Sequence, residues 1–322
     1  MCRRLKDTLQ GRMIDKRPIL IAGPTASGKS ALALALAEAL GGVVINADSM
    51  QVYRELRVLS ARPPAEDEDR APHKLYGHVP GREAYSAARF AREAGDAIQA
   101  ARDQGLVPIV VGGTGLYFKT LIEGLSPIPA VPDDVRAHWR GEADRIGAAA
   151  LHAILSDRDP LMAERLKPTD PQRLVRALEV LDATGRSLAE WQQDPGEPVL
   201  RAEDTRRFVI MPDREELRRR CDARFDLMMS GGALEEVRAL VTLGLDPDLP
   251  VMRALGVRPL AELLAGEINL EDATQRAKGE TRQYAKRQAT WINGNMSAWK
   301  LLSEQEMESL TANPALFVQS MS

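Results

Sequence analysis

An eight-residue stretch near the N-terminus has the pattern of a loop that binds phosphate. The stretch fits G-x-x-x-x-G-K-[ST] and consists of Gly23, Pro24, Thr25, Ala26, Ser27, Gly28, Lys29 and Ser30. In this pattern the glycines let backbone N–H groups turn towards phosphate oxygens, the lysine adds a positive charge, and the serine hydroxyl can bind Mg²⁺. An apolar run precedes the stretch and a helix-forming run follows it, which is the context that the motif requires. The stretch therefore predicts a site for a phosphorylated ligand, without identifying that ligand as ATP.

A carboxylate and a glycine-rich turn are expected beside the same ligand. Asp48 directly follows the apolar run 43–47, and Gly112–Gly115 directly follow the run 106–111. Because the carboxyl ends of parallel strands face the ligand crevice, Asp48 and Thr114 are predicted to lie near the phosphates. A P-loop ATPase normally has an acidic residue after the later strand, so its absence argues against a motor ATPase. The alternatives are a helix cap or an outer-sphere Mg²⁺ partner for Asp48, and a plain turn for 112–115.

Strands that alternate with helices predict the elements that position these residues. Strands are expected at 18–22, 43–47, 106–111 and 207–211, and helices at about 30–40, 84–101, 134–156, 171–184, 214–230, 233–243, 259–264 and 271–292. This order is typical of a parallel α/β sheet with crossover helices. Proline-rich segments at 124–134 and 193–198 interrupt it.

The interruption divides the chain into two expected parts. We predict an α/β core formed by residues 18–124 and 201–322, with residues 125–200 inserted as a helical unit. The polar and basic residues 1–17 are predicted to be a disordered extension, and Met13 is an alternative start.

Composition limits the function classes. The chain has 322 residues, of which 44% are hydrophobic and 28% charged, as in soluble globular proteins. Its net charge of −3 restricts any nucleic-acid contact to local patches. The two cysteines, Cys2 and Cys221, are too few for a zinc module or a disulfide framework and fit a reducing cytosol. No apolar run reaches 18 residues, so no membrane span is expected, and the four histidines show no metal-ligand spacing.

Two basic clusters are candidates for contacts with a polyanion. The Asp-Pro pair at 170–171 is expected to begin a helix, which places Arg173 and Arg176 near its start, where the helix dipole disfavours cations. An anionic ligand explains this placement, and an acidic partner elsewhere in the fold is the alternative. The second cluster recurs at every fourth residue of the last expected helix: Lys278, Arg282 and Lys286. Like charges at this spacing destabilise a helix, so phosphate binding is one explanation and a solvated face is the other.

Several of these stretches together resemble the bacterial tRNA dimethylallyltransferase (tRNA isopentenyltransferase) family. They are the phosphate loop, D-S-M-Q-V-Y at 48–53, V-G-G-T-G-L-Y-F-K at 111–119, D-P-Q-R-L-V-R-A-L-E-V at 170–180, and R-Q-Y-A-K-R-Q at 282–288 with Trp291. The motifs occur in order between about residues 18 and 300. The resemblance implies a P-loop, kinase-like core with a helical insertion that clasps the anticodon stem-loop of tRNA, and dependence on Mg²⁺.

The resemblance also implies a reaction and roles for single residues. Dimethylallyl diphosphate would be the donor, and the acceptor would be the exocyclic amine of the adenine 3′ of the anticodon, in tRNAs that read codons beginning with U. Asp48 matches the family's catalytic aspartate, Thr114 its crevice threonine, and Arg220 and Arg224 its diphosphate-binding arginines. The tRNA contacts would fall on Asp48, Ser49, Met50, Gln51, Thr114, Arg136, Gln172, Arg173, Leu174, Val175 and Arg176. Two departures are Val257, where the family usually has tyrosine, and S-A-R-P at 60–63 in place of T-A-K-P.

The chemistry of the reaction agrees with these residues. An allylic diphosphate ionises readily when its leaving group is stabilised, and the loop N–H groups, Lys29 and Mg²⁺ held by Ser30 can provide that stabilisation. An adenine amine is a weak nucleophile, so a base such as Asp48 is expected to accept its proton. The target base must leave its stack to reach the crevice.

Three rival functions remain at this point. They are a P-loop small-molecule kinase, an adenylate (AMP) isopentenyltransferase and a noncatalytic RNA-binding protein with a nucleotide switch. The switch would need an acidic residue after the run 106–111, which is absent. The helical insertion and the basic last helix argue against free AMP as the acceptor. We expect a cytoplasmic monomer with no membrane partner.

Overall fold

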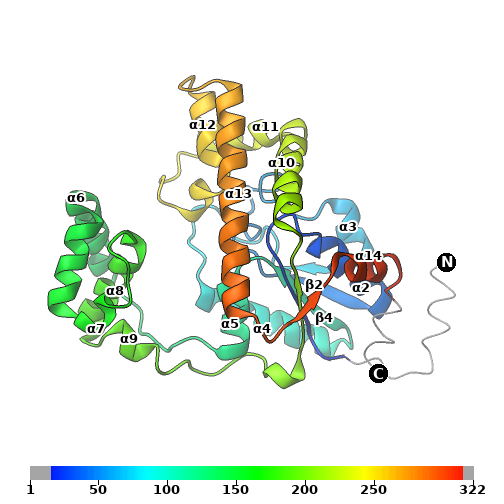
Figure 1. The fold of residues 1–322 in the computed structure, drawn as a ribbon, viewed down its shortest axis with the longest axis horizontal. Coiled ribbons are helices and arrows are strands. Elements are labelled where there is room, and N and C mark those ends of the chain that lie inside the picture. The colour runs from blue at the N-terminus through cyan, green and yellow to red at the C-terminus, as the bar shows by residue number, and fades with distance from the viewer. Residues whose placement is uncertain (1–15, 315–322) are drawn as a thin grey trace. The chain divides into compact units, whose positions relative to one another are not determined.

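The computed structural model describes residues 16–314, and the extension predicted for residues 1–17 lies almost entirely outside the described residues. The chain packs into two compact units (Figure 1). The first unit contains the chain up to residue 122 and again from residue 199, and the second unit contains residues 123–198. The helical insertion predicted for residues 125–200 differs from the second unit by two residues at each end.

A six-stranded parallel sheet forms the centre of the first unit. The strands are β1 (Ile19–Ala22), β2 (Gly42–Asn46), β3 (His73–Lys74), β4 (Val107–Gly112), β5 (Arg206–Ile210) and β6 (Lys300–Leu302). Their order is β3-β2-β4-β1-β5-β6, and every neighbouring pair is parallel. The four predicted strands are confirmed as β1, β2, β4 and β5. The sequence prediction missed β3 and β6, which form the two edges of the sheet.

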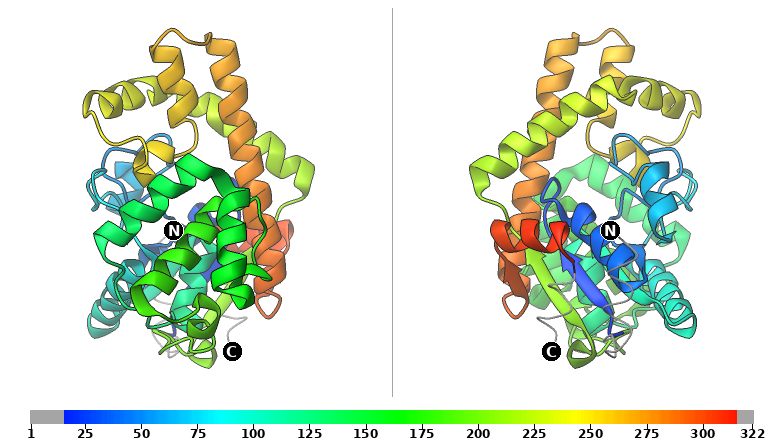
Figure 2. Two further views of the ribbon diagram at one scale, coloured as in Figure 1. Left: turned by 90° about the vertical axis from the view of Figure 1, so that its left-hand side faces the viewer. Right: turned by 90° about the vertical axis from the view of Figure 1, so that its right-hand side faces the viewer.

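Helices cover both faces of this sheet. They are α2 (Lys29–Leu40), α3 (Ala65–Arg70), α4 (Ala87–Asp103), α5 (Gly115–Glu123) and α14 (Glu304–Ala312). Alternate residues of β1 face opposite sides: Ile19 and Ile21 pack with α2, whereas Leu20 and Ala22 pack with α4 and α5. α14 lies beside α2 on the first of these faces (Figure 2). The predicted α/β core with a parallel sheet is therefore confirmed. Within residues 16–314, no helix has the length and apolarity that a membrane span requires.

Four further helices of the first unit form a separate cluster. They are α10 (Arg214–Ser230), α11 (Ala233–Thr242), α12 (Val257–Leu264) and α13 (Leu270–Asn295). α13 runs alongside α10 (Figure 1). The N-terminal half of α13 packs in the core of this cluster through Ala273 and Ala277, and its C-terminal end packs against the sheet through Ile292 and Met296. α13 therefore connects the helical cluster with the sheet.

The second unit is entirely helical in its regular structure. It contains α6 (Asp133–Arg158), α7 (Pro160–Ala163), α8 (Pro171–Thr184) and α9 (Leu188–Trp191). Gly147, with a φ of 76°, divides α6 into two helices. Trp139, Leu151 and Leu174 belong to its core. As the Asp-Pro pair predicted, the Asp170 side chain caps the start of α8 by accepting a hydrogen bond from the Arg173 N–H.

Candidate active site

The phosphate loop connects β1 to α2 and is curled by its own backbone. Ala26 and Gly28 have positive φ angles of 63° and 88°. The Ser27 N–H donates to the Pro24 carbonyl at 3.2 Å. A Cβ atom at Gly23 would lie 2.6 Å from Ser27 Oγ, so the curl requires glycine there. The loop and the positive end of α2 therefore present N–H groups to a ligand, as a phosphate site requires.

Lys29 and Arg224 place two cations beside this loop. Lys29 Nζ donates to the Pro24 carbonyl at 3.0 Å, and Arg224 Nη2 donates to Thr25 Oγ1. Burial lowers the pKa of Lys29 to about 8, while the nearby Asp48 opposes the shift and Arg224 adds to it. Burial also lowers the pKa of Arg224. A bound anion would favour the charged form of both side chains, so both are suited to a negatively charged ligand.

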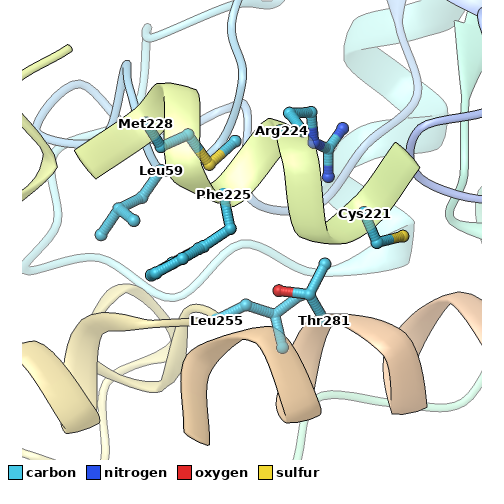
Figure 3. Close-up of a pocket in the computed structure, with 7 residues that line it drawn as sticks. All are labelled: Leu59, Cys221, Arg224, Phe225, Met228, Leu255 and Thr281. Carbon is cyan, nitrogen blue, oxygen red and sulfur yellow. The ribbon is translucent and has the colours of Figure 1, made fainter. Parts of the chain in front are cut away.

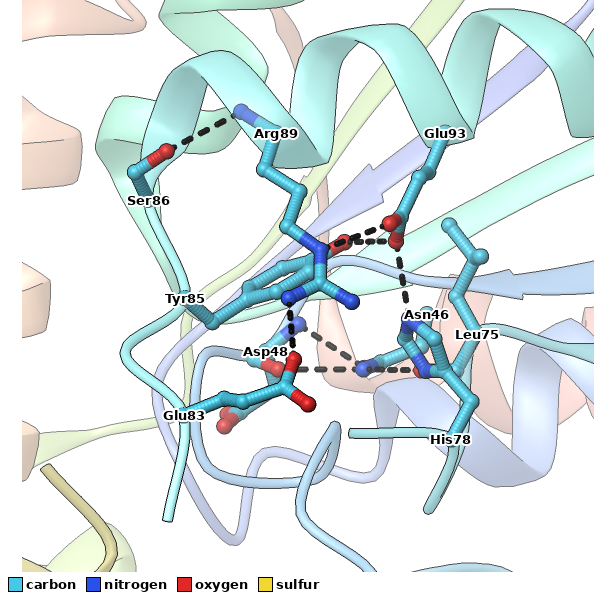
Figure 4. A network of polar contacts seen from close by, with 9 residues as sticks. All are labelled: Asn46, Asp48, Leu75, His78, Glu83, Tyr85, Ser86, Arg89 and Glu93. Carbon is cyan, nitrogen blue, oxygen red and sulfur yellow. Dashed lines mark hydrogen bonds and ion pairs between the residues drawn. The ribbon is translucent and has the colours of Figure 1, made fainter. Parts of the chain in front are cut away.

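Asp48 begins the loop after β2, where Asn46 fixes its backbone (Figure 4). Asn46 Oδ1 accepts from the Asp48 N–H at 2.8 Å, and Asn46 Nδ2 donates to the Asp48 and Leu75 carbonyls at 3.0 Å. The Met50 N–H donates to Asp48 Oδ1 at 2.9 Å. Asp48 Oδ2 has no hydrogen-bond partner among the described residues. One carboxylate oxygen of Asp48 is therefore held by the backbone, and the other is available to a ligand.

A polar network around Glu93 of α4 supports the neighbouring segment, residues 75–86 (Figure 4). Glu93 accepts hydrogen bonds from Tyr85 at 2.7 Å and from Arg89 at 2.8 Å, and it lies 2.8 Å from His78 Nε2. Burial alone would raise the pKa of Glu93, but the hydrogen bonds from Arg89, Tyr85 and His78 lower it to about 2. Arg89 also pairs with Glu83 at 2.9 Å. This network joins the segment to α4 and has a supporting role.

Thr114 connects the turn after β4 with the loop after β2. Its Oγ1 accepts from the Ser49 N–H at 3.0 Å and donates to Ser49 Oγ at 3.3 Å. A Cβ atom at Gly112 would lie 2.1 Å from the Ala47 carbonyl oxygen, so the close approach of the two loops requires glycine. Tyr284 of α13 lies close to Thr114 and Ser49, and burial raises its pKa. The Tyr284 hydroxyl therefore stays protonated at neutral pH.

The phosphate loop and the loop after β2 line one pocket of about 370 Å³. It is lined by residues 25–31 of the phosphate loop, Asp48, Gln51, residues 60–61, Arg220 and Arg224. Gln51 Nε2 donates to the carbonyls of Ser60 and Ala61, both at 2.9 Å, which fixes the orientation of its side chain. A phosphate-binding loop and a carboxylate therefore meet in a space large enough for a small ligand and part of a second one.

A second cavity lies between α10 and α13 (Figure 3). It is lined by Leu59, Cys221, Arg224, Phe225, Met228, Leu255 and Thr281. Its volume of about 20 Å³ suffices for about one water molecule, which excludes a substrate. Cys221 is a free, buried thiol whose pKa is raised by burial, so it lacks the thiolate character of a nucleophile.

The structure brings together most of the residues predicted to bind the diphosphate. Ser30 is exposed where the phosphate loop lines the pocket, and Arg224 contacts the loop directly. Arg220 also lines the pocket, but its guanidinium pairs with Glu216 and Glu304. A ligand anion would therefore compete with two carboxylates for Arg220, whereas Arg224 makes no ion pair with a carboxylate among the described residues.

The predicted tRNA-binding residues of the second unit fall into two groups. Arg173 is 72% exposed at its side chain and lies 3.3 Å from Asp170, and Arg176 lies 3.5 Å from Glu179. The exposed or partly exposed group is Arg136, Gln172, Arg173 and Arg176, and the buried group is Leu174 and Val175. The buried pair belongs to the core of the unit, so only its backbone is available to a partner.

The basic cluster on α13 is partly engaged within the fold. Lys278 Nζ lies 2.6 Å from Asp226, and Arg282 Nη1 lies 2.6 Å from Asp222, both on α10. Lys286 is exposed and has no side-chain partner among the described residues. Two aspartates on the neighbouring helix α10 are an explanation for the spacing of these cations that the sequence interpretation did not consider.

Four residues of the site received no role in the sequence analysis. They are Asn46 beside Asp48, and Tyr284, Gln288 and Trp291 on one face of α13. The motif at 282–288 indicated this helix but not which face meets the loops. A glutamine between alternating polar and apolar positions gives no sign of burial, yet Gln288 is only 5% exposed.

Comparison with known proteins agrees with this geometry. The family model of IPP transferases matches residues 51–295, and that of isopentenyl transferases matches residues 17–76. A tRNA dimethylallyltransferase of Parvibaculum lavamentivorans is 54% identical over 95% of this chain and 96% of its own length. That of Agrobacterium fabrum is 50% identical over 86% of this chain and 93% of its own length.

Solved structures lead to the same family. A eukaryotic dimethylallyltransferase acting on tRNA matches with a TM-score of 0.78 and 30% identity, covering 94% of this chain and 77% of that one. A tRNA isopentenylpyrophosphate transferase of Bacillus halodurans matches with a TM-score of 0.65 and 29% identity, covering 95% and 97%. By the extent and identity of these matches, the chain belongs to the tRNA dimethylallyltransferase family.

Proposed function

We propose that this chain transfers a dimethylallyl group from dimethylallyl diphosphate to tRNA and releases diphosphate. The acceptor is the exocyclic amine of the adenine 3′ of the anticodon, in tRNAs that read codons beginning with U. The observation that carries the proposal is the single pocket in which the phosphate loop and the Asp48 carboxylate face each other. Family membership supports the same conclusion, since the relatives are tRNA dimethylallyltransferases.

The phosphate loop, Lys29 and Arg224 bind the diphosphate of the donor. As the carbon–oxygen bond breaks, negative charge grows on the leaving diphosphate, and these groups already face the space where it develops. Mg²⁺ fits the same place, because it is usually held by one or two protein oxygens together with phosphate oxygens, and the exposed Ser30 hydroxyl offers one. When bound, the ion supplies further charge neutralisation for the leaving group.

Asp48 acts on the acceptor. The adenine amine attacks the allylic carbon, a carbon–nitrogen bond forms while the bond to the diphosphate oxygen breaks, and one amine proton moves to a carboxylate oxygen. Asp48 Oδ2 is suited to accept it, because Oδ1 is already engaged by the Met50 N–H. Thr114 is not among the residues that line the pocket, but it holds, through Ser49, the loop that carries Asp48. The adenine must be unstacked to enter the pocket.

The second unit and Lys286 contact the tRNA backbone. Arg136 and Arg173 present cations at the surface of this unit, and Arg176 is partly exposed while it pairs with the buried Glu179. Such contacts to phosphates fix the position of a nucleic acid, while the pocket selects the base. We propose that the enzyme works on tRNA in the cytoplasm, as a monomer.

No feature of the described residues favours either rival enzyme, the small-molecule kinase or the AMP isopentenyltransferase. A small-molecule kinase would transfer phosphate from ATP, yet β4 ends in Gly112 and the turn after it contains no acid to help hold the metal. An AMP isopentenyltransferase needs only the pocket, which leaves the 76 residues of the second unit, 123–198, without a purpose.

One experiment tests the proposed function against both rivals. The full chain is incubated with Mg²⁺, dimethylallyl diphosphate and unmodified tRNA, and nucleosides from the digested tRNA are examined by mass spectrometry. We expect a dimethylallyl adduct on the adenine 3′ of the anticodon, little product with AMP, and no phosphate transfer from ATP. Efficient prenylation of AMP, or an unmodified tRNA, would contradict the proposal.

A further inference from the structure

Gln288 of α13 joins the two loops that the reaction must align. Its Oε1 accepts from the Thr25 N–H at 2.8 Å, and its Nε2 donates to the Gly113 carbonyl at 2.9 Å. Thr25 belongs to the phosphate loop, and Gly113 directly precedes Thr114. We propose that Gln288 is a positioning residue that sets the distance between the loop that holds the donor and the loops that hold the acceptor. This inference rests on the function proposed above.

The chemistry of the two contacts explains why a carboxamide is needed. One partner is a backbone donor and the other a backbone acceptor, and a glutamine supplies an acceptor and a donor at the two ends of one rigid group. The orientation of the amide is set by these partners, since the reverse orientation would place like groups together. Another hydrogen bond between the loops, from the Gly23 N–H to the Gly112 carbonyl, is longer at 3.3 Å. Gln288 therefore makes the tighter connection.

Two neighbours on the same face of α13 hold Gln288 in place. Tyr284, one turn earlier, lies close to Thr114 and Ser49. Trp291, about one turn later, packs against the start of α5, where a Cβ atom at Gly115 would lie 2.0 Å from the indole ring. Residues at this spacing share one face of a helix. One rigid helix thus contacts the phosphate loop, the turn after β4 and the loop after β2.

Gly113 leaves the space that the Gln288 amide occupies. A Cβ atom at Gly113 would lie 2.1 Å from Gln288 Nε2, so alanine at this position would displace the amide. The backbone of Gly113 has no positive φ, so alanine there costs little in backbone strain. The hydrogen bond between Gln288 and Gly113 can therefore be broken independently by a substitution at either residue.

The inference predicts a loss of turnover and little loss of binding. A misplacement of about 1 Å between reacting groups costs roughly 10²-fold in rate, because the reacting atoms leave their near-attack geometry. In Gln288→Met, which keeps length and apolar volume but makes no hydrogen bonds, we expect kcat to fall about 10-fold to 100-fold. The donor KM and the tRNA Kd should stay within about threefold, since the loops themselves remain intact.

The experiment measures steady-state kinetics and tRNA binding of the full chain, with dimethylallyl diphosphate, Mg²⁺ and unmodified tRNA, well below the unfolding temperature of each variant. Gln275→Met is the matched control, because Gln275 is exposed on the same helix. Gln288→Glu keeps the acceptor for the Thr25 N–H but sets a carboxylate oxygen against the Gly113 carbonyl, so its kcat should fall at least as far as that of Gln288→Met. It also serves if Gln288→Met does not fold.

Gln288→Ala, Gly113→Ala and the double variant Gly113→Ala/Gln288→Ala form a cycle with the wild type. Both single changes break one connection, so the double variant should be no slower than the slower single variant, whereas independent defects would multiply. The inference is overturned if the wild type is active and Gln288→Met and Gln288→Glu both retain its kcat, or if the losses in the cycle multiply. An inactive wild type would instead overturn the proposed function.

Discussion

Arg224 of α10 and Arg173 of α8 are both predicted to bind an anion, but their surroundings are opposite. Arg224 is held against Thr25 of the phosphate loop, and burial lowers its pKa. Arg173 is 72% exposed, and its partner Asp170 lies at the start of its own helix, three residues away. Arg224 lines the pocket that a ligand would enter, whereas Arg173 remains in solvent.

Under the proposed function, the two surroundings suit two anions of different size. A diphosphate is small enough to be enclosed in a pocket. Cations that are shielded from water there stabilise its developing negative charge more strongly than solvated cations would. A tRNA is a large polyanion, and solvated arginines bind its phosphates through a salt-dependent release of counterions. Changes in the pocket should therefore alter rates strongly, and changes in the second unit should alter affinity and its salt dependence.

The largest effect is expected from Asp48→Asn. Asparagine keeps the shape and the hydrogen bond from the Met50 N–H but cannot accept the amine proton. Turnover should fall by roughly 10²–10⁴, the range for loss of a general base, while the tRNA Kd changes little. Single-turnover kinetics and tRNA binding measure the two quantities. An unchanged turnover, or a variant that only fails to bind tRNA, would show that Asp48 belongs with the binding residues.

Lys29→Ala should have the next largest effect. The change removes a desolvated charge beside the leaving group, and loss of such a group costs about 10²–10³ in rate. The assay is prenyl transfer with dimethylallyl diphosphate, and Lys74→Ala on the exposed edge strand β3 is the control. Near-normal turnover of Lys29→Ala would mean that the diphosphate binds elsewhere. Arg224 could then no longer be compared with Arg173 as a diphosphate-binding residue.

The same lysine predicts a pH dependence. In the free enzyme burial lowers the pKa of Lys29 to about 8, so the side chain is charged below that pH and neutral above it. The kcat/KM for the donor reports groups of the free enzyme, so it should decrease as pH rises through about 8. In Lys29→Arg this decrease should move to higher pH, because arginine keeps its proton. A profile identical in the two proteins would assign the decrease to another group.

The predictions from sequence succeeded where the signal is local. The strands β1, β2 and β4 are mostly apolar and buried along their whole length, as expected for a parallel sheet covered on both faces, and β5 has a buried apolar run at 208–210 after two arginines. α8 was predicted at about 171–184 and begins, as predicted, at the Asp-Pro pair, and the structure shows that Gly185 ends it in a left-handed conformation. β3 and β6 have two and three residues, too few for a pattern. The nine-residue, mostly polar α14 was missed although Ser303 and Glu306 form a capping box at its start.

The site was predictable only in part, for a related physical reason. The phosphate loop and Asp48 follow their strands directly, so local order places them at the ligand edge of the sheet. Gln288 meets Thr25 across 263 residues of chain, and Lys278 meets Asp226 across 52, contacts that no spacing encodes. The stripe on α13 was therefore interpreted without its acidic partners.

Replacing Arg173 and Arg176 together by glutamine tests the other side of the comparison. The slope of log Kd against log salt should decrease by about one unit for every tRNA phosphate that the variant no longer binds. The affinity for tRNA should fall most at low salt, and kcat at saturating tRNA should change little, because neither residue lines the pocket. Binding titrations at several salt concentrations measure the slope. A slope equal to that of the wild type would mean that both arginines serve only their partners Asp170 and Glu179.

The smallest effects are expected in the basic cluster on α13, where Lys278 and Lys286 should behave differently. Lys278 is 14% exposed and paired with Asp226, whereas Lys286 is exposed and unpaired among the described residues. In Lys286→Gln the salt slope of tRNA binding should decrease by about one unit if the side chain meets a phosphate. In Lys278→Gln the slope should stay the same and the free energy of unfolding should decrease by about 0.2–1 kcal/mol, the range for a partly exposed pair. Salt titrations and denaturant unfolding of the two variants separate these outcomes. Equal changes in the salt slope would mean that Lys278 exchanges Asp226 for a tRNA phosphate on binding. The distinction between enclosed and solvated cations would then not extend from α10 to α13.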